Sequence, residues 1–153
     1  MTTNRFFATV VVGSMLAVAA LAQSSDPLVG TWKLNAPKSK GAKAGTTVIE
    51  SAGKGYKFTV DLTTADGTEN HWGFTVDIDG KDHPITGTSP YGNAVALTRV
   101  NARTLRMSNK QDGKPTSTTT IVVSADGKTR TATTKGKNAK GEPVDAMSLY
   151  EKQ

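Results

Sequence analysis

Two histidines are the first candidates for chemistry in this chain, because imidazole serves both as a metal ligand and as a general base. His71 follows Glu69 by two residues, so both share one face of a strand, and His83 directly follows Asp82. A zinc site usually needs three or four ligands at close spacing, and the chain has no cysteine. Alternation places His71 on the polar face of its strand. We therefore expect solvent-exposed histidines and no metal site.

Carboxylates and hydroxyls give no stronger indication of a reaction. The tetrapeptide Asp77–Gly80 begins like a calcium-binding loop, but no glutamate completes the loop, and an Asp-Gly turn accounts for the same residues. Covalent catalysis needs a nucleophile with a base that a third group orients, and the chain has neither a cysteine nor a Gly-x-Ser-x-Gly motif. We expect a protein that is not an enzyme and that needs no cofactor.

Alternating aromatic residues are the remaining candidates, and they indicate binding. Apolar side chains recur at every second position over 56–62 and again over 72–78, so each segment has one apolar face and one polar face. Such a face either fills a core or forms the wall of a pocket, and both interpretations stay open for Trp72. Tyr91, in a Ser-Pro-Tyr-Gly-Asn loop, is a candidate for the rim of an opening. The predicted ligand-binding residues are Tyr56, Phe58, Trp72, Phe74, Met107 and Tyr150.

The elements that must position these residues are short strands separated by turns. Asp-Gly pairs at 66–67, 79–80, 112–113 and 126–127 are typical of β-hairpins. A meander of many strands has two exposed edges, which closure into a barrel removes. The sequence therefore predicts an all-β fold, a single antiparallel up-and-down β-barrel of about ten strands, with residues 36–45 as an irregular linker. The predicted strands are 28–35, 46–50, 56–63, 71–78, 83–86, 94–100, 104–109, 116–124, 129–135 and 144–151.

Threonines make the second half of the chain more polar. They lie on both faces of the strands near Thr118 and Thr131, so the inward face there is expected to be partly polar. A cavity that contains water would tolerate such a face, and a sheet wetted on both sides would produce the same pattern. Both alternatives stay open.

The start of the chain predicts export. Arg5 precedes an apolar run over residues 6–22, and Ala20-Leu21-Ala22 matches a signal-peptidase site, so we expect a signal peptide over 1–22. The remaining 23–153 is long enough for one domain. We expect a periplasmic or secreted monomer without a membrane span.

The positive charge is spread over turns. The formal net charge is +6, and its lysines include Lys54, Lys81, Lys114, Lys128 and Lys140. No aromatic residues interleave with these lysines, so we expect no nucleic-acid binding. Weak contact with an anionic envelope surface is the partner that such lysines favour.

Short motifs at both ends carry a family resemblance. Gly30–Leu34 resembles the Gly-x-Trp signature of the lipocalin and fatty-acid-binding-protein superfamily, the calycins, in which the tryptophan closes one end of the barrel. Leu149–Lys152 resembles the closing strand of fatty-acid-binding proteins, and Asp112–Lys114 and Asp126–Lys128 resemble their late hairpins. The chain also resembles exported bacterial proteins of similar length that are described as lipocalin-like.

Two features depart from that family. Fatty-acid-binding proteins insert a helical lid after the first strand, for which residues 36–45 are too short and too rich in glycine. The family holds a carboxylate with Arg-x-Tyr on the last strand. Here Tyr150 matches the tyrosine, but Ser148 stands at the arginine position. Arg99 or Arg106 would replace that arginine only if its strand turned it inward.

Two functions follow from these patterns. The first is an exported β-barrel that binds a small, largely apolar molecule in its interior. The alternative is a non-enzymatic envelope structural or interaction protein with a filled barrel and no ligand, whose working surface is the lysine-bearing turns. Salt-sensitive binding that is lost on charge reversal at Lys54, Lys81 and Lys128 would favour the alternative.

Overall fold

The computed structural model describes residues 26–153, so the predicted signal peptide over 1–22 lies outside the described residues. The described chain is a single antiparallel sheet of eleven strands and one short 3-10 helix, η1 (Ala36–Lys38). The strands are β1 (Gly30–Leu34), β2 (Ala42–Ala52), β3 (Gly55–Thr64), β4 (Glu69–Asp77), β5 (Asp82–Pro84), β6 (Thr86–Gly87), β7 (Ala94–Asn101), β8 (Thr104–Gln111), β9 (Lys114–Val123), β10 (Thr129–Lys137) and β11 (Pro143–Lys152).

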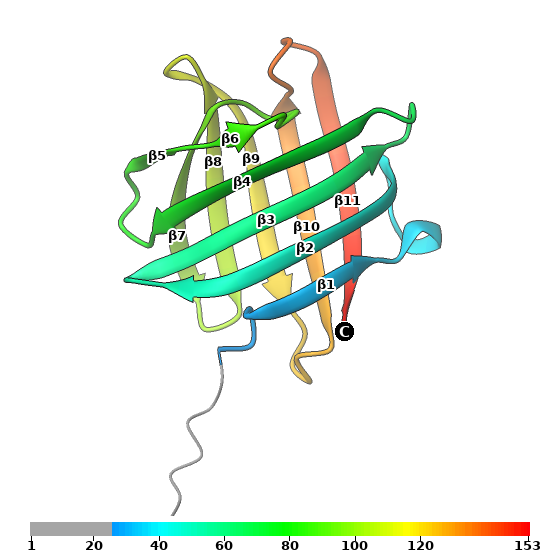
Figure 1. The fold of residues 1–153 in the computed structure, drawn as a ribbon, viewed down its shortest axis with the longest axis vertical. Helices are drawn as coiled ribbons and strands as arrows, with labels where there is room; N and C mark the ends of the chain where they lie inside the picture. Colours follow the sequence, from blue (N-terminus) through cyan, green and yellow to red (C-terminus); the bar gives the residue numbers. More distant parts are fainter. Residues whose placement is uncertain (1–25) are drawn as a thin grey trace, which may run out of the picture.

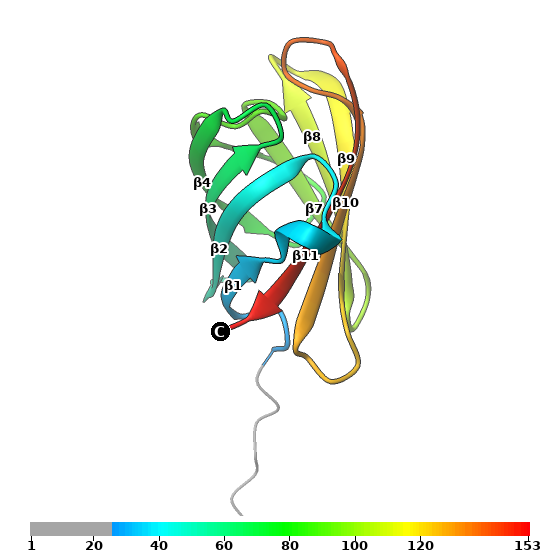
Figure 2. The same cartoon turned by 90° about the vertical axis from the view of Figure 1, so that its right-hand side faces the viewer.

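The sheet curls into an up-and-down barrel that is nearly closed. The first strand pairs with the last, with Trp32 opposite Lys152 and Leu34 opposite Tyr150. Strands β1–β4 form one wall and β7–β11 the other, and the two walls cross at a large angle (Figures 1 and 2). This confirms the predicted fold class and is consistent with a calycin-like barrel.

Closure is incomplete between β4 and β7, and the segment between these strands bridges the gap. Strand β6 pairs with β4, with Gly73 opposite Thr86, whereas β5 pairs with β7, with His83 opposite Val95. The single strand predicted over 83–86 is therefore wrong. Two short strands form because the chain passes from the edge of β7, where β5 pairs, to the edge of β4, where β6 pairs. Asp79–Gly80 therefore begins this crossing segment and not a simple hairpin.

The predicted linker over 36–45 is also partly wrong. Asn35 caps η1 by accepting a hydrogen bond from the backbone N–H of Lys38, and β2 then begins at Ala42, four residues before the predicted start at Thr46. Residues of low strand propensity extend β2 because β3 offers backbone partners as far as Thr64, through a bulge near Ala44.

The late hairpins form as predicted. Strands β8 and β9 meet at Asp112 and Gly113, whose φ angles are 51° and 75°. Two successive residues in the left-handed region are the condition for a type I′ turn, whose twist matches that of paired strands.

One end of the barrel is closed by Trp32 and the residues before β1. Trp32 is fully buried, and its Nε1–H donates to the Leu28 carbonyl oxygen at 2.9 Å. The Lys152 ammonium lies 5.0 Å from the centre of the Trp32 ring and donates to the Pro27 carbonyl at 3.1 Å. These contacts are consistent with the predicted role of Trp32 as a barrel-end plug.

Within residues 26–153, no helix has both the length and the apolar character needed to cross a membrane.

Candidate binding cavity

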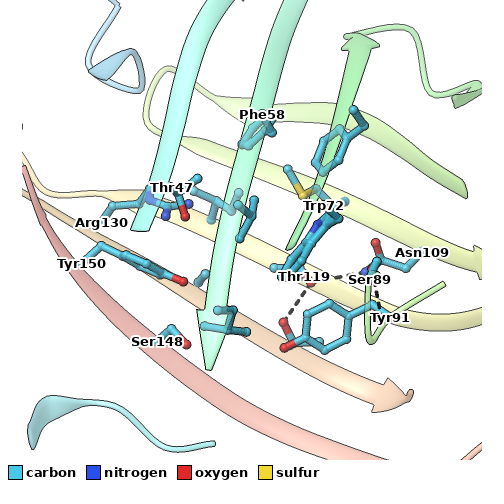
Figure 3. A pocket seen from close by; sticks show the side chains of 17 residues that line it. Thr47, Phe58, Trp72, Ser89, Tyr91, Asn109, Thr119, Arg130, Ser148 and Tyr150 are labelled. Carbon is cyan, nitrogen blue, oxygen red and sulfur yellow. Dashed lines mark hydrogen bonds between the residues drawn. The ribbon is translucent and has the colours of Figure 1, made fainter. Parts of the chain in front are cut away.

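A small cavity lies between the two walls of the barrel. Its volume is about 80 Å³, which is below the roughly 150 Å³ that accommodates benzene in a protein core. Its apolar side comes from inward-facing residues of β3 and β4, as the alternation of those strands predicts. That side consists of Phe58, Val60, Leu62, Trp72 and Phe74, and Figure 3 labels Phe58 and Trp72 among them.

Aromatic packing organises the apolar side. Phe58 and Phe74 are directly opposite each other across β3 and β4, and their rings stack at a centroid distance of 4.8 Å. Such cross-strand aromatic pairs stabilise a sheet and leave a smooth surface toward the interior. Trp72 continues this surface toward the open end of the barrel, where its ring meets Tyr91 edge to face at 6.3 Å.

Five of the six predicted binding residues line the cavity: Phe58, Trp72, Phe74, Met107 and Tyr150. Tyr56, the sixth, does not line it. Although Tyr56 is buried on the same face as Phe58, it lies farther toward the closed end and hydrogen-bonds to Asp26 and Arg99.

The opposite side of the cavity is polar. Asn109 on β8 donates from its side-chain amide to Ser117 at 3.2 Å and to Thr119 at 3.4 Å. The Thr119 hydroxyl in turn shares a hydrogen bond of 2.9 Å with Thr134 on β10. These side chains are buried, so the partly polar inward face predicted for the second half belongs to an enclosed wall and not to a sheet wetted on both sides.

Arg130 is the most informative residue of the cavity. Its side chain is 3% exposed, and its Nε and NH2 atoms have no hydrogen-bond partner within residues 26–153. The guanidinium lies 4.2 Å from the centre of the Tyr150 ring and 5.6 Å from that of Trp32. Burial lowers the pKa of Arg130 to about 10, although Tyr150 opposes this effect, so the side chain remains a cation at neutral pH.

Sequence reasoning missed Arg130, although a signal for it existed. Arg130 is directly opposite Val123 across the β9–β10 hairpin and opposite Tyr150 on its other side. Opposite residues of paired strands share a face, so the apolar Val123 could have predicted that Arg130 points inward. Arg106, in contrast, is exposed, and Arg99 lies at the closed end, so neither of the two predicted substitutes lines the cavity.

A wider hollow adjoins the cavity at the open end of the barrel. This mouth has a volume of about 650 Å³ and lies between the β3–β4 turn, the β10–β11 turn and the loop over residues 88–91. Ser89 and Tyr91 line both the cavity and the mouth. The cavity and the mouth therefore meet at these two residues, and Tyr91 lies at the rim of an opening, the position for which it was a candidate.

The two histidines lie away from the cavity. His71 is exposed on the outer face of β4, with Nδ1 2.5 Å from a carboxylate oxygen of Asp61. His83 lies 3.3 Å from Asp79. In the part of the chain that the structure describes, no three histidine, aspartate or glutamate side chains gather in an arrangement that could hold a metal ion.

We predict a pH-dependent contribution of Tyr56 to stability. Burial and the hydrogen bond to Asp26 raise the pKa of Tyr56 to about 12, above its value of about 10 in an unfolded chain. Its stabilising effect is therefore complete below pH 10 and is lost as the pH rises through 12. Urea unfolding of the native protein and Tyr56→Phe should show a stability difference that shrinks above pH 10. A difference that is the same at pH 8 and pH 12 would contradict this assignment.

Comparison with known proteins does not assign a family to the chain. A scan against protein-family models finds no match, and a search of curated proteins also returns none. The function must therefore be argued from the cavity itself.

Proposed function

We propose that this protein binds a small organic anion with an apolar body inside its barrel. The single observation that carries the proposal is the buried guanidinium of Arg130, two of whose nitrogens have no partner among residues 26–153. Burial of an unpaired charge costs several kcal/mol, and a carboxylate that accepts from the free N–H groups would compensate for that cost through a charge-assisted contact.

The apolar body of the ligand follows from the other residues of the cavity. Beyond Arg130 and Tyr150, the cavity leads between the aromatic side and Ala132, a small residue two positions along β10. The stacked pair of Phe58 and Phe74 and the adjacent Trp72 offer flat apolar surface, which suits a planar or ring-containing body. An apolar pocket with few polar groups is the usual form of a small-molecule site.

This proposal is favoured over a filled barrel without a ligand. In a filled barrel, the contacts of Arg130 with Tyr150 and Trp32 would have to compensate for the burial of its charge alone, whereas a bound anion adds hydrogen bonds to its Nε and NH2 atoms. We further propose that the chain is a binding protein of the calycin type and not an enzyme, and that it is exported as a monomer. The predicted signal peptide over 1–22 and the Gly-x-Trp motif at Gly30–Trp32 support that part of the proposal.

The test compares two molecules with the same skeleton and different charge. Cinnamate and cinnamyl alcohol should be titrated into the purified protein at pH 7 by calorimetry, and the protein as purified should be examined by native mass spectrometry for a bound acid. We expect one molecule of cinnamate per chain, bound at least about tenfold more tightly than the alcohol. Equal affinities would contradict an anion site, and binding of neither molecule would favour the filled barrel.

A further inference from the structure

Tyr91 reaches the cavity from a loop and not from a strand. It follows Pro90 in the loop between β6 and β7, and its half-buried side chain separates the cavity of about 80 Å³ from the mouth of about 650 Å³. Figure 3 shows Tyr91, Ser89 and Asn109 in one part of the cavity, with Arg130 and Tyr150 in another. The cavity is small while Tyr91 is in place, so an outward rotation of this side chain would give room for a ligand larger than a few atoms.

The backbone of the loop is anchored on both sides of Tyr91. The Thr116 hydroxyl donates to the Tyr91 carbonyl oxygen at 2.5 Å, and the Ala139 N–H donates to the Pro90 carbonyl oxygen at 2.8 Å. Gly92 has a φ of 141°, and a Cβ at this position would lie only 2.2 Å from the Lys110 carbonyl oxygen. With the backbone held so closely, a rotation of the Tyr91 side chain toward the mouth is a simpler way to open the cavity than a movement of the whole loop.

Inside the cavity, Tyr91 makes the contacts that a bound aromatic molecule would make. Its ring packs edge to face against Trp72 at a centroid distance of 6.3 Å. Burial and the neighbouring Tyr150 raise the pKa of the Tyr91 hydroxyl, whereas Thr134 lowers it. Thr134 lines the same cavity as Tyr91. Thr134 is at the end of the buried chain of hydrogen bonds from Asn109 through Thr119.

We propose that Tyr91 is a displaceable occupant of the binding site, and that the ligand is an aromatic acid whose ring carries a hydroxyl or carbonyl oxygen. When Tyr91 turns outward, the ligand ring takes its place beside Trp72 and the ring oxygen takes its place at Thr134. This inference rests on the proposed function, because it takes Arg130 as the partner of the acid group.

The spacing along β10 limits the length of such a ligand. Arg130, Ala132 and Thr134 all face the cavity from one strand, and four residues of strand span roughly 13 Å between the first and last Cα atoms. Because the arginine side chain is long, its guanidinium can shorten this span. An acid group and a ring oxygen on the order of 10 Å apart, as in 4-hydroxycinnamate, therefore match the two ends of the site, with Ala132 leaving room for the carbons between them.

The experiment uses 4-hydroxycinnamate and cinnamate, which differ only in the ring oxygen. Calorimetric titration of the full chain should show about tenfold tighter binding of 4-hydroxycinnamate, the value of one net hydrogen bond. Thr134→Val should abolish this preference and leave the affinity for cinnamate nearly unchanged. Thr134→Ser keeps the hydroxyl and should restore the preference, which separates the loss of the hydroxyl from any damage to the fold.

Association rates test the displacement of Tyr91. In stopped-flow mixing, Tyr91→Ala should bind 4-hydroxycinnamate several-fold faster than the native protein, whereas Tyr91→Phe, which keeps the ring, should bind it at close to the native rate. The inference is overturned if the two acids bind equally tightly, if Thr134→Val weakens both to the same extent, or if Tyr91→Ala leaves the rate unchanged. In each of these cases Arg130-dependent binding of cinnamate would leave the proposed function standing. If neither acid binds, both proposals fail.

Discussion

Replacement of Arg130 by methionine is expected to weaken cinnamate binding by about 10- to 100-fold, the loss that follows removal of a charge-assisted hydrogen bond. Methionine is about as long as the aliphatic stem of arginine and carries no charge, so the cavity keeps its apolar side, including the Phe58–Phe74 stack. The affinity for cinnamyl alcohol should stay nearly the same, because a neutral molecule forms no charge-assisted hydrogen bond with Arg130. Titration of both molecules into the variant measures the effect.

The same substitution should not destabilise the empty protein. Arg130→Met removes a buried cation whose Nε and NH2 lack partners within residues 26–153, and relief of that desolvation opposes the loss of the contact with Tyr150. We expect the free energy of unfolding in urea to stay the same or to rise by up to about 2 kcal/mol. Arg106→Met, at an exposed arginine, is the matched control and should bind cinnamate like the native protein.

A destabilised Arg130→Met variant would change the interpretation of this residue. It would mean that the guanidinium holds Trp32 and Tyr150 together as a structural element of the closed end. If affinity for cinnamate were also unchanged in that variant, the anion site would have to be abandoned.

The largest effect on stability is expected at Trp32. Trp32→Ala should lower the free energy of unfolding by about 3–5 kcal/mol, because a fully buried indole is replaced by a methyl group and a cavity remains. The substitution also removes the donor to the Leu28 carbonyl oxygen and the ring beneath Lys152. Small domains are stable by about 5–15 kcal/mol in total, so the variant should keep only a small free energy of unfolding. Urea unfolding followed by circular dichroism measures the change.

Trp32→Phe is the control for this prediction. It keeps an aromatic ring at the closed end and loses the Nε1–H bond, so the expected loss is smaller, about 1–2 kcal/mol. A loss below about 1 kcal/mol in Trp32→Ala would show that the segment before β1 closes the barrel without the indole.

The strands β3 and β4 were predictable because alternation acts locally. Their apolar residues, from Tyr56 to Leu62 and from Trp72 to Val76, face the interior as expected, since successive side chains of a strand point to opposite faces. The hairpins at Asp112–Gly113 and Asp126–Gly127 were also predictable, because their turns depend on local backbone freedom: Asp112, Gly113 and Gly127 have positive φ angles.

The crossing between β4 and β7 could not be read from local pattern. Whether residues 82–87 form one strand or two depends on which edges of the sheet lie beside them, and those edges belong to β4 and to β7. The length of β2 has the same cause, because the partners of its first residues are on β3.

The sequence by itself determined the fold class, the late hairpins and the five aromatic and apolar residues of the predicted wall that line the cavity, because these depend on periodicity and on turn chemistry. Only the tertiary structure decided which polar groups share the cavity with them. Arg130, Thr134 and Tyr91 come from a late strand and a loop, and their meeting with Phe58 and Trp72 depends on closure of the sheet. The physical reason is that the burial of a charged side chain inside a barrel, and the groups it contacts, depend on strands that are distant in the sequence. Those strands come together only when β1 pairs with β11.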